Sequence, residues 1–145
     1  AHATDEDLWK DLELAQAADF VREKPCQLDS PVEAGGTNFS GGQRQRLTIA
    51  RALVGNPRIV ILDDSASALD FATDASLRRA LYSLRTEVTS VIISQRVAAV
   101  MQADQILVLD HGYQVGLGTH KELLATCPLY KEICLSQLRP EEVEA

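Results

Sequence analysis

The sequence predicts an α/β fold, because the periodicity of its apolar residues changes along the chain. Residues 59–62 (Ile-Val-Ile-Leu) and 91–93 (Val-Ile-Ile) are continuous apolar runs of β-favouring residues. Such runs are typical of strands buried on both faces of a parallel sheet. A helix is predicted between them from apolar residues at helical spacing, which are Leu77, Ala80, Leu81 and Leu84. Together the three segments predict a βαβ unit.

Helices are predicted before this unit. Thr4, with an Asp three residues on, favours the start of a helix, and Pro25 closes the helical stretch that follows. Ser40 and Gln43 have the spacing of a capping box, so a second long helix is expected to begin there. Residues 55–57 (Gly-Asn-Pro) are its stop signal.

A hairpin and two helices are predicted after the βαβ unit. Two short apolar runs, residues 106–109 and 113–115, flank Asp-His-Gly at residues 110–112, with Gly at a position that needs a positive φ. Thr119 and Glu122 form another capping box, which opens the first of two closing helices.

Composition excludes several classes of protein. The 145 residues carry 14 Lys and Arg against 21 Asp and Glu, a net charge of −7, which argues against nucleic acid as a partner. No apolar run approaches the roughly 18 residues of a spanning helix, so this piece is expected to be soluble. The three cysteines lack CxxC spacing and are expected to be free thiols. His2, His111 and His120 lack ligand spacing and are expected on the surface.

Two segments contain candidate chemistry. Residues 38–43 (Asn-Phe-Ser-Gly-Gly-Gln) place two glycines at a helix start, where free amides and the helix dipole favour an anion. A phosphate clamp and a simple helix cap are both open readings of this segment. Asp63 and Asp64 end the first strand, where ligands of open α/β sheets bind. They predict either a Mg²⁺ and water site or an ordinary strand end. Residues 67–70 alone predict only a helix cap.

The order and spacing of these segments resemble the ABC ATPase family over nearly the whole chain. Residues 40–43 are similar to the signature motif, with Phe39 where the family commonly has Leu. Residues 59–63 resemble Walker B, and residues 67–70 the D-loop. The loop around Glu33 resembles more loosely the exporter loop that contacts coupling helices of the membrane domain. Residues 116–124 also resemble the exporter subclass.

The resemblance implies ATP and Mg²⁺ as ligands and assigns site residues. Mg²⁺ is expected at Asp63, and catalytic positions at Asp64 and Gln95. Nucleotide contacts are expected at Ser40, Gly41, Gly42, Gln43 and Asp70. The implied fold is a partial P-loop NTPase (ABC ATPase) fold. It has a helical subdomain over residues 1–57 and the C-terminal half of the RecA-like core over residues 58–145.

Two positions depart from the family pattern. Asp64 stands where the family usually has Glu, which withdraws the carboxylate by roughly 1.5 Å. Misplacement on the order of 1 Å can cost about a hundredfold in rate. Gln95 stands at the switch position of the family's His, and an amide cannot take up a proton near neutral pH. Since ABC sites are composite, the chain resembles the degenerate half of a heterodimeric exporter, whose signature completes a partner's site.

The P-loop GxxxxGK[ST] does not occur in this sequence, because no lysine follows a glycine. The P-loop, the Q-loop and the adenine-stacking aromatic are therefore expected before residue 1, and the fragment alone is expected to be inactive. The implied location is the cytoplasmic face of the cell membrane, as part of a transporter. Two alternatives stay open: a regulatory half that binds nucleotide without hydrolysis, and the C-terminal lobe of a chromosome-maintenance or DNA-repair ATPase.

Overall fold

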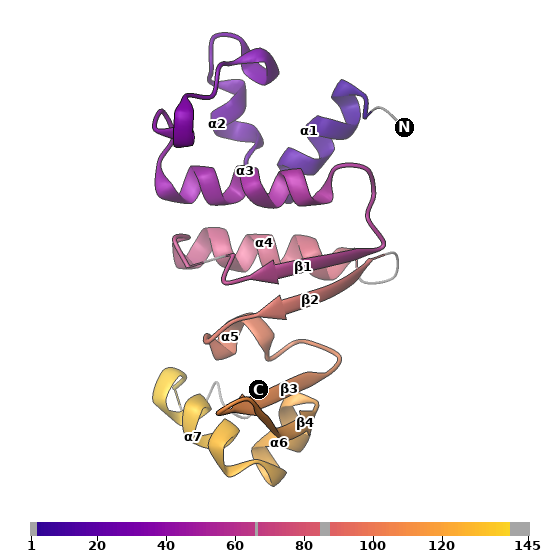
Figure 1. The fold of residues 1–145 in the computed structure, drawn as a ribbon, viewed down its shortest axis with the longest axis vertical. Coiled ribbons are helices and arrows are strands. Elements are labelled where there is room, and N and C mark those ends of the chain that lie inside the picture. Colours follow the sequence, from indigo (N-terminus) through magenta and orange to yellow (C-terminus); the bar gives the residue numbers. More distant parts are fainter. Residues whose placement is uncertain (1–2, 66, 85–87, 140–145) are drawn as a thin grey trace. The chain divides into compact units, whose positions relative to one another are not determined.

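The computed structural model describes residues 3–65, 67–84 and 88–139. The chain folds as two compact units, residues 1–93 and residues 94–145. Both units combine helices with paired strands, so the α/β class is confirmed. Figure 1 shows the elements of each unit in chain order. The subdomain boundary predicted after residue 57 falls within the first of these units. It concerns the division into subdomains, and it stays a prediction.

The first unit begins with helices and ends with a parallel pair of strands. Its elements are α1 (Asp5–Leu14), α2 (Ala18–Arg22), two 3₁₀ turns (Gln27–Asp29 and Ala34–Gly36), α3 (Gly41–Leu53), β1 (Ile59–Asp63), α4 (Phe71–Ser83) and β2 (Thr89–Ile93). The two strands pair in parallel, with Ile59 opposite Thr89 and Asp63 opposite Ile93. The predicted βαβ unit is therefore confirmed.

One hydrophobic core holds this unit together. Leu12 of α1, Ile49 of α3 and Leu77 of α4 are buried in it, and so are Val60 and Leu62 of β1. In Figure 1, α1 and α2 lie on one side of α3, and the β1 and α4 layer lies on the other. The helical segments and the strand pair are thus packed as one body, with α3 in its centre.

The strands are not buried on both faces, contrary to the sequence prediction. Burial alternates along β1, where Ile59 and Ile61 are 63% and 64% exposed while their neighbours are buried. Val91 and Ile93 of β2 are also exposed. The helices of this unit bury one face of the pair and leave the apolar side chains of the other face in contact with solvent.

The second unit is a hairpin packed against helices. It contains α5 (Val97–Val100), β3 (Ile106–Asp110), β4 (Tyr113–Gly118), α6 (His120–Thr126) and α7 (Pro128–Gln137). The strands are antiparallel, as predicted. Both residues of the two-residue loop have positive φ, 47° at His111 and 82° at Gly112, as tight hairpins of type I′ require.

His120 corrects a sequence expectation, because it is buried rather than at the surface. Its Nδ1 lies 2.8 Å from the hydroxyl of Tyr130, so a polar pair joins α6 to α7 inside the core of the unit. Burial raises the pKa of the Tyr130 hydroxyl, which keeps that hydroxyl neutral. His111 is exposed, as expected, and His2 lies outside the described residues.

Three helices begin where the sequence predicts. Complete capping boxes join Thr4 to Asp7, Ser40 to Gln43 and Thr119 to Glu122. The three described cysteines are free thiols. Among the described residues, no helix combines the length and the apolar character that crossing a membrane requires.

Candidate nucleotide site

The signature residues lie at the exposed N-terminus of α3. The Ser40 hydroxyl accepts a hydrogen bond from the Gln43 amide at 3.2 Å, and the Gln43 carbonyl oxygen Oε1 accepts one from the Ser40 amide at 2.9 Å. Among the described residues, none accepts a hydrogen bond from the amides of Gly41 and Gly42. The cap therefore shapes the helix start and leaves two amides of the positive dipole end for an anion. A helix cap and a phosphate-binding role, the two alternatives predicted for residues 38–43, are therefore compatible.

Phe39, directly before the signature, packs into the core of the first unit. Its ring is buried and meets the ring of Phe20 edge-on, with 6.1 Å between the centroids. The Lys24 ammonium lies 4.6 Å from the same ring centroid. An aromatic residue at the position where the family commonly has Leu thus fills the core between α2 and the start of α3, and fixes where Ser40 emerges.

The loop around Glu33 is tied to the same helix. The Arg44 guanidinium donates to the carbonyl of Phe39 at 2.8 Å and to that of Gly36 at 3.4 Å. A Cβ at Gly36, where φ is 65°, would lie 2.9 Å from the Arg44 side chain, so only glycine fits there. Within the loop, the Thr37 hydroxyl donates to the Glu33 carboxylate at 2.8 Å. A displacement of this loop would therefore reach the signature through Arg44.

Asp63 and Asp64 lie at the carboxyl end of β1 and are both exposed. The Asp64 amide donates to the Ile93 carbonyl of β2 at 3.0 Å. Its backbone has a φ of 45°, a left-handed conformation that Asp tolerates better than most residues. The sheet thus turns sharply at Asp64, directly after the strand, and presents two hard carboxylate ligands at that edge.

The loop after Asp64 packs against the signature. A Cβ at Gly42 would lie 3.1 Å from the carbonyl oxygen of Ala68, and one at Gly41 would lie 3.9 Å from the Ala68 side chain. A side chain at position 42 would force the Ala68 carbonyl to shift, so glycine suits this close approach independently of any ligand. The structure brings the predicted signature and D-loop residues together within the first unit.

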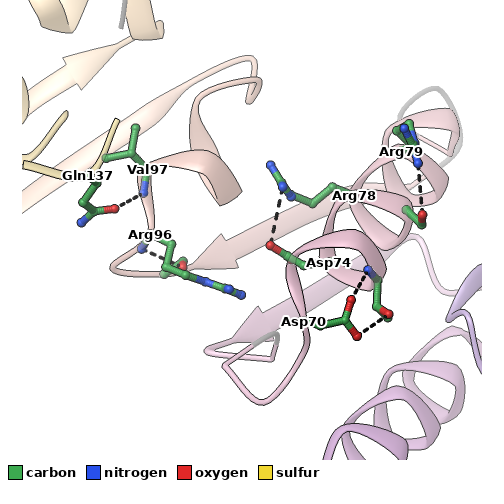
Figure 2. Close-up of polar contacts among 10 residues, drawn as sticks. Asp70, Asp74, Arg78, Arg79, Arg96, Val97 and Gln137 are labelled. Atoms are coloured by element: carbon green, nitrogen blue, oxygen red, sulfur yellow. Dashed lines mark hydrogen bonds and ion pairs between the residues drawn. The ribbon is translucent and has the colours of Figure 1, made fainter. Parts of the chain in front are cut away.

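Asp70 ends this loop as the N-cap of α4. Its carboxylate accepts from the Thr73 amide at 2.9 Å and from the Thr73 hydroxyl at 2.8 Å, as drawn in Figure 2. These hydrogen bonds, above all the one from the amide, lower the pKa of the Asp70 carboxyl. Further along α4, Asp74 forms an ion pair with Arg78 at 3.5 Å. The structure assigns Asp70 a capping role, and its nucleotide contact stays a prediction.

Gln95 lies in the second unit, in the loop that precedes α5. The Gln137 side chain of α7 forms hydrogen bonds to this loop at two positions. Its Nε2 donates to the Gln95 carbonyl at 2.9 Å, and its Oε1 accepts from the Val97 amide at 2.9 Å. Figure 2 shows the contact between Gln137 and Val97. The Ser94 hydroxyl accepts from the Arg96 amide at 3.1 Å. The backbone on both sides of Gln95 is thus held by side-chain hydrogen bonds.

Sequence reasoning missed two residues of this region, Gln45 and Gln137. Gln45 reaches from α3 to the loop after Asp64, and Gln137 reaches from α7 to the loop of Gln95. Neither position belongs to a short motif. Their only sequence signal is a side chain that can both donate and accept hydrogen bonds on an otherwise amphipathic helix.

The residues present fit phosphate and a hard cation. Ser40 supplies a hydroxyl beside the free amides of Gly41 and Gly42, and the carboxylates of Asp63 and Asp64 are the oxygen ligands that Mg²⁺ prefers. A phosphate-cradling P-loop is absent from the printed sequence. Among the described residues, the start of α3 therefore suits phosphate and the end of β1 suits a hard cation.

Comparisons with known proteins show what the chain is similar to. Residues 2–67 match the ABC transporter family. An uncharacterized ABC transporter ATP-binding protein of Mycobacterium tuberculosis is 46% identical over 134 residues, which cover 92% of this chain and 23% of that protein. A multidrug resistance ABC transporter ATP-binding and permease protein of Lactococcus lactis is 44% identical over 135 residues, 93% of this chain and 23% of that protein. The chain thus spans about a quarter of the length of these relatives.

A solved structure gives the same result for the fold. The chain superposes on the structure of a bacterial Atm1-family ABC exporter with ATP bound with a TM-score of 0.87 and 33% sequence identity. The match covers 94% of this chain and 24% of the exporter chain. The partial ABC ATPase fold predicted from the sequence is therefore confirmed. The chain therefore has the fold of part of an ABC transporter ATP-binding domain, and it is similar to ABC transporter ATP-binding proteins and to a solved ABC exporter.

Proposed function

We propose that this chain is the signature-bearing part of an exporter ATPase that couples ATP binding and hydrolysis, with Mg²⁺, to transport across a membrane. The observation that carries the proposal is the start of α3, where Ser40 and Gly41 are exposed and Gly42 is half-buried at the positive end of the helix. An anion-binding helix end at the surface suits a site whose other half comes from a second domain.

The signature would complete the ATP site of a second nucleotide-binding domain. In that site, the Ser40 hydroxyl and the two glycine amides would contact the γ-phosphate, and Gln43 would hold the helix start through the capping box. Asp63 would hold Mg²⁺ at a different nucleotide, the one bound by the domain to which this chain belongs. One chain therefore serves two ATP molecules.

The site on this chain's own side would hydrolyse slowly. Asp64 has a shorter side chain than the usual Glu, and Gln95 cannot exchange a proton near neutral pH. We therefore assign the chain to the degenerate half of a heterodimer. The regulatory alternative, a half that never hydrolyses ATP, differs only in the residual rate of this one site, and the same kinetic assay separates the two.

The proposed partners are transmembrane domains, contacted near Glu33, at the cytoplasmic face of the membrane. The Arg44 contacts support this assignment, because they join the Glu33 loop to the helix that bears the signature. In this assignment, residues 1–57 form the helical subdomain and residues 58–145 the C-terminal half of the ATPase core. The named transporter relatives favour export over a chromosome-maintenance role.

The test is ATP turnover of the longer transporter that contains this chain, purified with its partner half. Ser40→Arg places bulk and misdirected charge where the helix start must approach phosphate, so we expect nearly complete loss of turnover. Thr48→Arg is the matched control, because Thr48 is exposed on the same helix and receives the same side chain. If Ser40→Arg and Thr48→Arg turn over ATP equally, the signature has no role and the proposal fails.

A further inference from the structure

Gln45, in the second turn of α3, joins the signature helix to the loop that follows β1. Its Nε2 donates to the Asp64 carbonyl at 3.1 Å and to the Ser67 hydroxyl at 3.3 Å. Its Oε1 accepts from the Ala68 amide at 2.9 Å. One side chain thus forms hydrogen bonds to both ends of a short loop. Its partners in this loop lie 19 to 23 residues after Gln45 in the sequence.

These contacts act on the backbone of the candidate catalytic residue. The Asp64 carbonyl also accepts from the Ser67 amide at 3.3 Å, and the Asp64 amide is held by the Ile93 carbonyl. With a φ of 45°, Asp64 adopts a conformation that needs support from its surroundings. Gln45 and β2 supply that support from opposite sides of the residue, so the direction of the Asp64 carboxylate depends on both.

The same loop is in van der Waals contact with the signature. The Ala68 carbonyl lies so close to Gly42 that a Cβ there would be 3.1 Å away. The loop and the start of α3 therefore touch at Gly42 and are bonded at Gln45, one turn apart on the same helix. The loop therefore lies close to α3 at Gly42 and is hydrogen-bonded to it at Gln45.

We propose that Gln45 is a positioning residue that fixes Asp64 and the loop of residues 67–70 against the signature, so that the two ATP sites to which this chain contributes change geometry together. This rests on the proposed function, in which Ser40 and Asp64 serve different nucleotides. Gln45 acts through the backbone of the loop and not on a nucleotide. Its role requires a side chain that donates to one end of the loop and accepts from the other, which an amide does.

Three variants separate positioning from stability. Gln45→Ala removes all three hydrogen bonds. Gln45→Glu keeps the size and the acceptor for the Ala68 amide, but turns a carboxylate toward the Asp64 carbonyl. Thr48→Ala is the control, because Thr48 lies on the same helix and its hydroxyl bonds only within it, to the Arg44 carbonyl.

The first measurement is hydrogen exchange by mass spectrometry on the full-length transporter assembled with its partner half. In Gln45→Ala, we expect amide exchange in residues 64–69 to be about tenfold faster, as loss of such hydrogen bonds implies, with the rest of α3 unchanged. Thr48→Ala should leave these amides at the parental rate. Parental exchange of residues 64–69 in Gln45→Ala would overturn the proposal.

The second measurement is ATP turnover of the same proteins. Gln45→Ala should lower kcat on the order of tenfold with little change in KM. Gln45→Glu should also lower kcat, because its carboxylate cannot donate to the Asp64 carbonyl. Parental kcat in Gln45→Ala would overturn the coupling of the two sites. If the parent itself shows no turnover, the proposed function fails, and the exchange measurement still decides the positioning role.

Discussion

Asp64 has both a short side chain and a left-handed backbone, and the two are related. Its carboxylate is short for the position that the family usually fills with Glu, and its backbone is left-handed, with a φ of 45°. Among residues other than glycine, Asp and Asn are the ones most often found in that region, because a short polar side chain relieves the crowding of Cβ against the backbone. We propose that this Asp weakens hydrolysis, and the same residue suits the turn.

Asp64→Glu tests this reading of the residue. The change restores roughly 1.5 Å of reach, but Gln95 stays in place and the left-handed turn suits Glu less well. We expect at most partial rescue of hydrolysis at this site, measured as turnover of the assembled transporter after the partner's own hydrolysing site has been inactivated. Asp64→Asn, of the same size and uncharged, is the control. A rate equal to that of an unmodified ABC site would show that Gln95 and the turn do not limit the reaction.

At the scale of elements, carboxylates fix the starts of several helices. Hydrogen bonds from Thr4 lower the pKa of Asp7, and those from Thr119 lower the pKa of Glu122, in each case with the backbone amide as the largest cause. At the start of α4, hydrogen bonds from Thr73 lower the pKa of Asp70 in the same way. A lowered pKa means that the folded state prefers the ionised form, so each cap stabilises the fold above the ordinary pKa. The stabilisation is lost as the pH falls through the lower, folded-state pKa.

Asp70→Asn isolates one of these contributions. Asn keeps an acceptor oxygen for the Thr73 amide but does not titrate, so the variant should be close to the parent in stability at pH 7. Below the ordinary aspartate pKa of 3.8, the parent loses the stabilisation and the variant does not. Urea unfolding of both chains at several pH values measures the difference. A difference independent of pH would contradict the assignment, and Asp70→Ala, which lacks the cap throughout, gives the lower reference.

The elements also show how far sequence reasoning reaches. The capping boxes, the βαβ unit and the hairpin were predictable because each depends on residues close in sequence or on a simple periodicity. Gln45 and Gln137 were not, because their bonds span 19 to 23 and 40 to 42 residues. His120 was wrongly expected at the surface, since its burial depends on a partner hydroxyl on another helix. The order of motifs predicted the site residues, and tertiary contacts showed how the loops that carry them are held.

At the scale of the whole molecule, exposed apolar surface distinguishes this chain from an independent domain. Ile59, Ile61, Val91 and Ile93 are exposed on the strand pair of the first unit. On the hairpin of the second unit, Leu107, Leu109, Val115 and Leu117 are exposed in the same way. Apolar strand faces and strand edges of this kind are covered by other elements in stable soluble domains, and when bare they promote association.

We therefore expect the isolated chain to be marginally stable or to self-associate. Sedimentation velocity should show species larger than the monomer at micromolar concentration, and Ile61→Lys, which charges the middle of the exposed β1 face, should shift the population toward monomer. Val32→Lys is the matched control, because Val32 is equally exposed but lies outside the strands. A parent chain that stays monomeric and unfolds in one sharp, cooperative transition would contradict this expectation.

The isolated chain should also bind ATP very weakly. The signature supplies two amides and a hydroxyl, but the lysine and the amide nest that cradle phosphates in P-loop proteins are absent from the printed sequence. Titration calorimetry with ATP and Mg²⁺ measures the affinity directly. A dissociation constant in the micromolar range would mean that the described residues form a complete site on their own, against the composite arrangement.

We propose that this chain is the degenerate half of a pair, with Ser40 at the partner's hydrolysing site and Asp64 at its own slow site, and one comparison of turnover rates in the assembled transporter tests this assignment. Asp64→Ala removes a carboxylate from a site that contributes little hydrolysis, so most of the parental rate should remain. Ser40→Arg blocks the partner's competent site and should leave almost none. If Asp64→Ala abolishes turnover as thoroughly as Ser40→Arg, the assignment of this chain to a degenerate half is wrong.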